Sequence, residues 1–335
     1  MVVKKIAIEE HFSTPENSKL WNDSGEADRN GKSYTDFIVD RLWDDNKAYQ
    51  DELNRLGIVH TVMSLTSPGG VQGIDDPKTA VDLAHSSNQD AYDHYVKSNP
   101  KQFSMFAAVA LQDPNEAAKE AEHAVKDLGA KGILINGYTN MGDVNTPMYL
   151  DDPKVDVFWQ KISELDVPVY LHPREPMPAS TQIYQGYPEL IGSAWGGFTQ
   201  ETAVHAIRLI MSGLFDRYPN LTVVLGHLGE GLSQTLPRTE HRLFRQRNGE
   251  VNAKNVKPLT SYLHTNFMCT TSGHYDTDAL ESAIEAFGPD RVMFSVDYPY
   301  ENNSDAANWF DQLSLPEDIK QQIAYDNAAR LLHIK

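Results

Sequence analysis

Two side chains of types that bind metals stand close together near the start of the chain, in the segment KIAIEEHF at residues 5–12. The apolar run at 6–8 is typical of a buried strand, and Glu9 and His11 follow it two positions apart. Successive side chains of a strand point to opposite faces, so we expect Glu9 and His11 on one face and Glu10 on the other. A carboxylate and an imidazole aimed into the same space form half of a metal site.

Three later segments repeat this design, in which an apolar strand ends in a residue able to bind a metal. They are VPVYLHP at 167–173, LTVVLGH at 221–227 and RVMFSVDYP at 291–299, with the polar residues His172, His227 and Asp297. In a parallel α/β barrel the strand ends meet at one face, so side chains distant in sequence can converge there. We therefore expect one divalent metal ion per subunit, Zn²⁺ or Mn²⁺, bound by two imidazoles and two carboxylates. The predicted ligands are Glu9, His11, His172 and Asp297.

Further polar residues follow the same strand ends. Glu230 comes three residues after His227, and a carboxylate can fix the tautomer and orientation of an imidazole. We expect this pair above the metal, the simpler alternative being a histidine that caps its strand. Arg238, two turns into the next helix, is expected to anchor an anionic substrate or hold Glu230, or else to form a surface salt bridge. His274 is either a substrate contact or a loop histidine.

Eight apolar segments alternate with helical patterns, which predicts a parallel sheet with right-handed crossovers. Together with ligand-type residues at the strand ends, this pattern favours an α/β fold, a (β/α)8 TIM barrel. Strands are expected at 4–11, 58–65, 103–110, 132–136, 167–172, 221–227, 263–270 and 291–297.

The chain shows no linker and no break in composition, so we expect a single domain over residues 1–335. Two stretches, 13–45 and 174–198, are too long for ordinary connections. They are predicted to be insertions after strands 1 and 5. Loops that follow barrel strands lie on the active face, so both should cover the substrate.

Composition restricts the partners and the compartment. A formal net charge of −18 over 335 residues argues against nucleic acid, which requires a clustered basic surface. No long apolar stretch follows Lys4 and Lys5, so neither a signal peptide nor membrane association is expected. The single cysteine, Cys269, excludes an intramolecular disulfide and is read as a small buried apolar residue. We expect a cytoplasmic protein.

Five motifs occur in order along the chain. They are EEHF at 9–12, YLHPR at 170–174, GLFDRYPNLTVVLGHLGEG at 213–231, TTSGHY at 270–275 and FSVDYPYE at 294–301. With these motifs the chain resembles the metal-dependent aromatic decarboxylases of the amidohydrolase superfamily. Within that group it is most similar to γ-resorcylate (2,6-dihydroxybenzoate) and 2,3-dihydroxybenzoate decarboxylases, of the type of aminocarboxymuconate semialdehyde decarboxylase.

The resemblance has implications for the site and the assembly. It implies a barrel with the four predicted ligands on the metal. It places His227, Glu230 and Arg238 around a small aromatic carboxylate substrate, and it implies a homodimer or homotetramer.

A hydrolase is the alternative within the same superfamily. Hydrolytic members with two metals carry H-x-H on strand 1 and a bridging lysine at the end of strand 4. Here strand 1 offers Glu9-x-His11, strand 132–136 ends in Asn136, and Lys131 lies at the opposite end. One metal ion is therefore favoured. A mononuclear hydrolase of a lactone or amide stays open as the second hypothesis, and a non-catalytic barrel with a structural metal as the third.

The resemblance implies nonoxidative decarboxylation of an o-hydroxybenzoate. Direct loss of CO2 would leave an aryl carbanion, so the ring carbon should be protonated first. We expect Asp297 to donate this proton, assisted by His227 and Glu230, while the metal acts as a Lewis acid. The motifs are divided on the substrate. EEHF and residues 134–137 favour 2,6-dihydroxybenzoate, whereas residues 66–69, 272–274 and 297–299 favour 2,3-dihydroxybenzoate.

Overall fold

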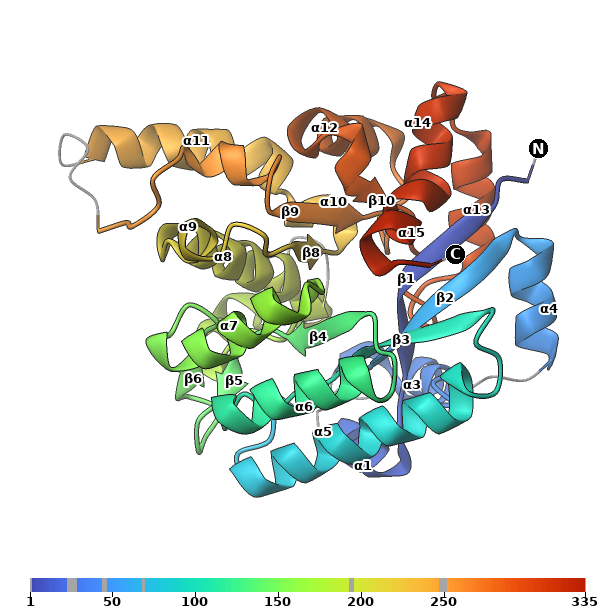
Figure 1. Ribbon diagram of the computed structural model, residues 1–335, viewed down its shortest axis with the longest axis horizontal. Coiled ribbons are helices and arrows are strands. Elements are labelled where there is room, and N and C mark those ends of the chain that lie inside the picture. Colours follow the sequence, from blue (N-terminus) through green and yellow to red (C-terminus); the bar gives the residue numbers. More distant parts are fainter. Residues whose placement is uncertain are drawn as a thin grey trace.

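Eight parallel strands form a ring surrounded by helices in this computed structural model (Figure 1). The structure describes residues 2–22, 29–43, 47–67, 70–192, 196–246 and 252–334. Within them the barrel strands are neighbours in chain order, as successive right-handed βα units require. The predicted (β/α)8 barrel is confirmed. Its strands are β1 (Lys5–Phe12), β2 (Ile58–Leu65), β3 (Phe103–Ala107), β4 (Gly132–Asn136), β7 (Val169–His172), β8 (Val223–Leu225), β9 (Phe267–Thr270) and β10 (Val292–Met293).

Helices connect the strands and cover the outside of the ring (Figure 1). In α6 (Pro114–Lys126) the side chain of Asp113 accepts hydrogen bonds from the first-turn N–H groups, and an alanine face is buried. Gly129, with φ of +72°, follows the helix end. Other helices are α4 (Lys47–Arg55), α5 (Pro77–Ala91), α7 (Asp156–Leu165), α8 (Gly197–Met211), α11 (Leu232–Arg245), α12 (Thr277–Phe287), α13 (Asn303–Gln312), α14 (Glu317–Gln321) and α15 (Asn327–Leu332).

A change of register in β1 aims the ligand side chains inward. Ile8 belongs to the apolar cluster inside the barrel, so strict alternation would place Glu9 outside. However, three residue steps along β1, from Ala7 to Glu10, match two steps along β2. This one extra residue reverses the alternation, so that side chains after it point to the opposite face from the one expected. Glu9 and His11 therefore share the interior with the apolar core, and Glu10 points to the seam beside them.

Insertions follow strands 1 and 5 of the barrel, as predicted. The first contains α1 (Pro15–Asn22) and α3 (Lys32–Val39), and the second contains the short helices η3 (Pro178–Tyr184) and η4 (Pro188–Gly192). A small hairpin after β4 was not predicted; its strands are β5 (Thr139–Asn140) and β6 (Pro147–Met148). Strands of two residues are too short to leave a period-2 signal in the sequence.

Some element boundaries differ from the sequence prediction. The helical segment after the second insertion is divided at Gly213, with φ of +73°, so that α8 ends at Met211 and the chain continues as α9 (Leu214–Arg217). The last strand is much shorter than the predicted 291–297, because the residues after Met293 bond mainly to side chains and to β1. Cys269 is fully buried, as expected. Among the described residues, no helix is both long and apolar enough to cross a membrane.

His205 on α8 is a buried titratable group that belongs to neither the group of four possible metal ligands nor the cavity lining. Its Nε2 accepts a hydrogen bond of 2.9 Å from the backbone N–H of Leu150. Burial, with a smaller effect of the Arg208 charge, lowers the pKa of His205 to about 3. The unfolded chain protonates this side chain near pH 6.5, so between these two pH values it binds more protons than the folded chain. This residue therefore makes the free energy of unfolding fall as pH drops from about 6.5 towards 3.

We predict that His205→Gln reduces this pH dependence, because an amide oxygen can accept the same hydrogen bond without titrating. The measurement is the free energy of unfolding in urea at pH 7 and pH 5, followed by circular dichroism. His241→Gln, an exposed change on α11, should retain the native difference between the two pH values. A native difference in His205→Gln as well would contradict the prediction.

Candidate metal centre and active site

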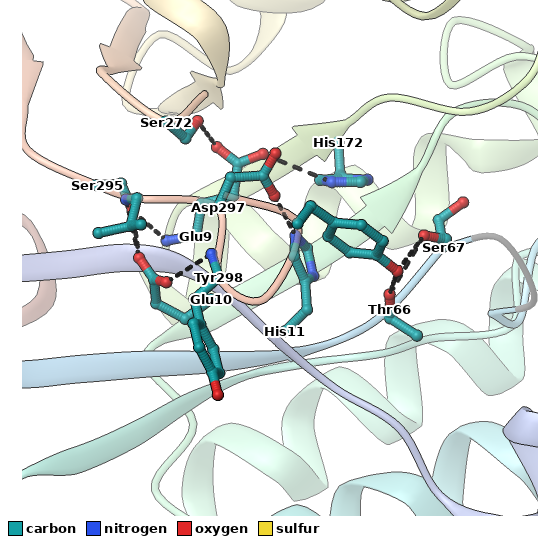
Figure 2. Close-up of polar contacts among 12 residues, drawn as sticks. Glu9, Glu10, His11, Thr66, Ser67, His172, Ser272, Ser295, Asp297 and Tyr298 are labelled. Carbon is teal, nitrogen blue, oxygen red and sulfur yellow. Dashed lines mark hydrogen bonds and ion pairs between the residues drawn. The ribbon is translucent and has the colours of Figure 1, made fainter. Parts of the chain in front are cut away.

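The four predicted metal ligands converge at the carboxyl ends of the barrel strands. Glu9, His11, His172 and Asp297 each offer one ligand atom, and these atoms lie within 4.8 Å of one another. Nε2 of His11 is 3.1 Å from Oδ1 of Asp297, and Nε2 of His172 is 3.5 Å from Oε1 of Glu9. Figure 2 shows the four side chains grouped around a common point. They come from β1, from the end of β7 and from the segment after β10.

The two carboxylate oxygens of Glu9 have different surroundings. Oε2 accepts hydrogen bonds from the hydroxyls of Tyr170, Thr270 and Ser272. Oε1 is buried and has no hydrogen-bond partner among the described residues. Burial raises the pKa of Glu9, and a fully buried carboxylate is costly unless a cation compensates it. A divalent ion beside Oε1 would meet this requirement.

His172 presents an unprotonated nitrogen to the same point. Its Nδ1 is 2.9 Å from the carbonyl oxygen of Pro173, so Nδ1–H donates there and the lone pair of Nε2 faces Glu9 and His11. Burial, reinforced by the neighbouring His11, lowers the pKa of His172 well below its usual range. A neutral imidazole oriented by a carbonyl is the usual form of a metal-binding histidine. The residues present therefore fit a divalent metal ion.

His227 and Glu230 form the predicted pair. Nδ1 of His227 is 2.8 Å from Oε1 of Glu230, and its Nε2 is 3.5 Å from Oδ2 of Asp297. Burial alone would lower the pKa of His227, but the carboxylates of Glu230, Glu9 and Asp297 raise it well above its usual value. Burial alone would raise the pKa of Asp297, yet hydrogen bonds from His11 and His227 lower it. Between His227 and Asp297, the proton therefore resides on the imidazole.

The backbone that carries this pair adopts a rare conformation. His227, Leu228 and Glu230 have φ values of +50°, +55° and +55°, and Asp297 has +80°. Left-handed conformations of residues other than glycine cost about 1–3 kcal/mol each and gather at functional sites. Gly229 lies among them, where a Cβ would come within 2.5 Å of the ring of Phe287. This turn demands glycine in the sequence HLGEG.

A cavity of about 670 Å³ opens above the ligand cluster, within the range of small-molecule sites. His172, His227, Glu230, His274 and Asp297 line it, which places His274 where a substrate contact was predicted. Glu9 and His11 are fully buried and do not belong to its lining.

Both insertions contribute to the walls of this cavity. Arg29 and Tyr34 come from the first insertion and Glu189 from the second. The guanidinium of Arg29 forms an ion pair with Glu175, which ties the first insertion to the segment after β7. Both insertions thus form part of the cavity wall.

Arg238 lies elsewhere. It is exposed on α11, a helix that extends away from the ring of strands (Figure 1), and it does not line the cavity. Among the described residues Glu230 is held by Thr199, whose hydroxyl is 2.8 Å from Oε2, and Arg238 makes no such bond. The expectation that Arg238 anchors the substrate or holds Glu230 is therefore not met within one chain, because Arg238 lies on the solvent-exposed face of α11.

Sequence reasoning missed several residues of the site. Tyr170 could have been found, because it precedes His172 by two positions on the same strand face. Thr199, Arg29 and Glu301 also line the cavity. Arg29 lies in the first predicted insertion and Glu301 ends the motif FSVDYPYE, but neither residue was singled out because their segments lack strand periodicity.

The barrel, the two-histidine, two-carboxylate cluster and the cavity above it define a metal-dependent α/β-barrel enzyme. A family profile described as amidohydrolase matches residues 44–334. The gamma-resorcylate decarboxylase of Rhizobium sp. (strain MTP-10005) is 40% identical over 334 residues, which cover 98% of each chain. The chain belongs to the amidohydrolase family, among its aromatic-acid decarboxylases.

Solved structures agree with this assignment. A 2,6-dihydroxybenzoate decarboxylase in complex with 2,6-dihydroxybenzoate superposes with a TM-score of 0.90 at 39% identity, covering 99% of each chain. A dihydroxybenzoic acid decarboxylase from Polaromonas sp. JS666, with bound manganese and the inhibitor 2-nitroresorcinol, gives 0.90 at 38% identity. That match covers 99% of this chain and 97% of the other.

We predict that Tyr170→Phe weakens Mn²⁺ binding by about 10- to 100-fold, because it removes a hydroxyl that holds Oε2 of Glu9. The dissociation constant is measured by titrating metal-free protein with Mn²⁺ and following free Mn²⁺ by electron paramagnetic resonance. Tyr262→Phe is the matched control, since it removes a buried hydroxyl that bonds Asp216, and it should bind Mn²⁺ like the native protein. Unchanged affinity in Tyr170→Phe would refute the role of its hydroxyl.

Proposed function

We propose that this protein is a metal-dependent nonoxidative decarboxylase of an o-hydroxybenzoate, with 2,6-dihydroxybenzoate as the preferred substrate. The observation that carries the proposal is the position of Asp297. It belongs to the ligand cluster, lines the cavity and lies 3.5 Å from His227. The similarity to gamma-resorcylate decarboxylases over 98% of the chain favours the 2,6-isomer over the 2,3-isomer, a choice that the motifs left open.

One divalent ion would be held by Glu9, His11, His172 and Asp297. Mn²⁺ is supported by the manganese in the Polaromonas relative, and Zn²⁺ suits the same donor set. When bound, the ion would supply Lewis-acid stabilisation of negative charge on the phenolic and carboxylate oxygens of the substrate. The remaining chemistry belongs to side chains of this chain.

The central step is protonation of the ring carbon that bears the carboxylate. The proton resides on His227 before substrate binds; His227 passes it from Nε2 to Asp297, and Asp297 donates it to the ring carbon. Glu230 keeps Nδ1–H of His227 directed to itself, so that Nε2 faces Asp297. The C–C bond to the carboxylate then breaks, its electron pair returns to the ring, and CO2 leaves. A positioned proton donor contributes on the order of 10²- to 10⁴-fold to such a step.

Other residues of the cavity bind the substrate. His274 lines the wall and is placed to contact a ring substituent. Both insertions contribute to the cavity wall and would reduce contact between the bound substrate and water. Arg238 is left out of the site of its own chain because it is exposed on α11.

A mononuclear lactone or amide hydrolase is the less favoured function. The end of β4 offers the buried Asn136 rather than a bridging lysine, and Lys131 stands at the other end of that strand. The relatives about 40% identical to this chain over nearly its whole length are decarboxylases.

We also infer the wider context of the enzyme. A single domain over residues 1–335 is supported by one apolar core that includes residues from most of the barrel units. A homodimer or homotetramer is supported by exposed apolar side chains, Ile183, Val204 and Phe244, which are 74%, 54% and 72% accessible. A cytoplasmic location is supported by the lone, buried Cys269. Analytical ultracentrifugation of the purified protein tests the assembly.

We predict that the Mn²⁺-loaded protein releases CO2 from 2,6-dihydroxybenzoate faster than from 2,3-dihydroxybenzoate, 2,4-dihydroxybenzoate or salicylate. Asp297→Asn should lower kcat by about 10²- to 10⁴-fold, because an amide cannot donate the proton. Asp82→Asn on the surface of α5 should leave kcat unchanged. Substrate loss and CO2 are followed together.

Two outcomes would contradict this proposal. Native turnover by metal-loaded Asp297→Asn would remove Asp297 as the acid. Hydrolysis of a lactone or ester panel without CO2 release from any benzoate would favour the hydrolase.

A further inference from the structure

The barrel closes at an unusual seam between β1 and the last strand. β10 pairs with β9 through Val292 and Met293 only. Towards β1 the structure has an isolated bridge between Glu10 and Tyr298 instead of a continuous ladder. Two backbone hydrogen bonds reinforce it, from Asp297 N–H to the Glu9 carbonyl and from His11 N–H to the Tyr298 carbonyl.

The side chain of Glu10 occupies this seam. Its carboxylate is 1% exposed. Oε1 accepts hydrogen bonds of 3.0 Å from the backbone N–H of Val296 and from the hydroxyl of Ser295. Oε2 accepts one of 2.9 Å from the backbone N–H of Tyr298. Figure 2 shows Glu10 directed to Ser295 and Tyr298, away from the ligand cluster.

Ser295 connects this carboxylate back to β1. Its hydroxyl donates to Oε1 of Glu10 and accepts hydrogen bonds of 2.9 and 2.7 Å from the N–H groups of Ile8 and Glu9. Those two residues lie where the register of β1 shifts. The hydroxyl therefore satisfies backbone donors that the register shift leaves without a ladder partner.

The two amides bound by Glu10 stand on either side of Asp297. Asp297 itself has φ of +80°, a conformation that needs support from its surroundings. A carboxylate that holds residues 296 and 298 fixes the backbone between them, and with it the direction of the Asp297 side chain. We propose that Glu10 is a positioning residue, which acts through Asp297 by holding its backbone in the orientation that faces the metal and the cavity.

Only a carboxylate long enough to reach both amides suits this position. Both oxygens of Glu10 face hydrogen-bond donors. In Glu10→Gln the side-chain NH2 group replaces one of the two oxygens and must face a hydrogen-bond donor. At least one hydrogen bond is then lost, and two N–H groups point at each other. Glu10→Asp retains a carboxyl group but is one methylene shorter and cannot span the same two amides.

A double-mutant cycle on Mn²⁺ affinity tests this role. The four proteins are the native chain, Glu10→Gln, Asp297→Asn and the double variant, and their dissociation constants for Mn²⁺ are measured by electron paramagnetic resonance. We expect Glu10→Gln to raise the dissociation constant about tenfold or more in the native background. In the Asp297→Asn background it should change by less than about twofold, the scatter of independent sites.

Controls separate positioning from general stability. Circular dichroism confirms folding of each variant. Glu120→Gln is the matched control, because Glu120 is a partly buried carboxylate that accepts hydrogen bonds from Asn88 and His85 between outer helices. It should not change Mn²⁺ affinity. Should Glu10→Gln fail to fold, Glu10→Asp replaces it in the cycle with the same expectation.

The cycle also distinguishes this proposal from the proposed function on which it builds. An equal loss of affinity in both backgrounds would overturn the positioning role, since Glu10 would then act without Asp297. Coupling to Asp297 in a protein that decarboxylates no benzoate would support the role of Glu10 and overturn the proposed reaction.

Discussion

The site depends on holding two carboxylates, Glu9 and Asp297, together in a buried place. Like charges at short separation in a low-dielectric interior repel strongly and raise one another's pKa. The side chain of Glu9 is completely buried, and that of Asp297 is 13% exposed. Such a pair persists only with positive charge and hydrogen-bond donors around it. This requirement explains why imidazoles, hydroxyls and a candidate divalent ion gather at one point.

The donors are divided between the two carboxylates by position. Hydroxyls of Tyr170 on β7, Thr270 on β9 and Ser272 just after β9 hold Oε2 of Glu9, and all three side chains are buried. Asp297 instead borders the cavity, next to a histidine whose pKa is raised. The two carboxylates thus have different surroundings: Glu9 is enclosed by hydroxyls, and Asp297 lies beside an imidazole at the edge of the cavity.

The barrel supplies the rigidity that this arrangement needs. Left-handed residues at 227, 228, 230 and 297 each carry a conformational cost, and each lies within five residues of the end of a short strand, β8 or β10. The apolar layers inside and outside the ring hold the strand ends in place. The insertions are tied by Arg29 and Glu175 and form part of the cavity wall, so substrate specificity can vary in the loops while the ligand geometry is maintained.

The sequence by itself determined the fold class, the cluster of four predicted metal ligands and the His227–Glu230 pair. Apolar runs that end in ligand-type residues are local signals, and parallel barrel topology brings such ends together. Only the tertiary structure decided how Glu9 and His11 enter the interior, because the register shift in β1 depends on pairing with β2. It also assigned Tyr170 and Thr199 their partners and moved Arg238 out of the site. Those contacts join elements that are distant in the chain. A hydrogen bond between two such elements produces no repeating pattern in the sequence of either element, so it cannot be predicted from sequence alone.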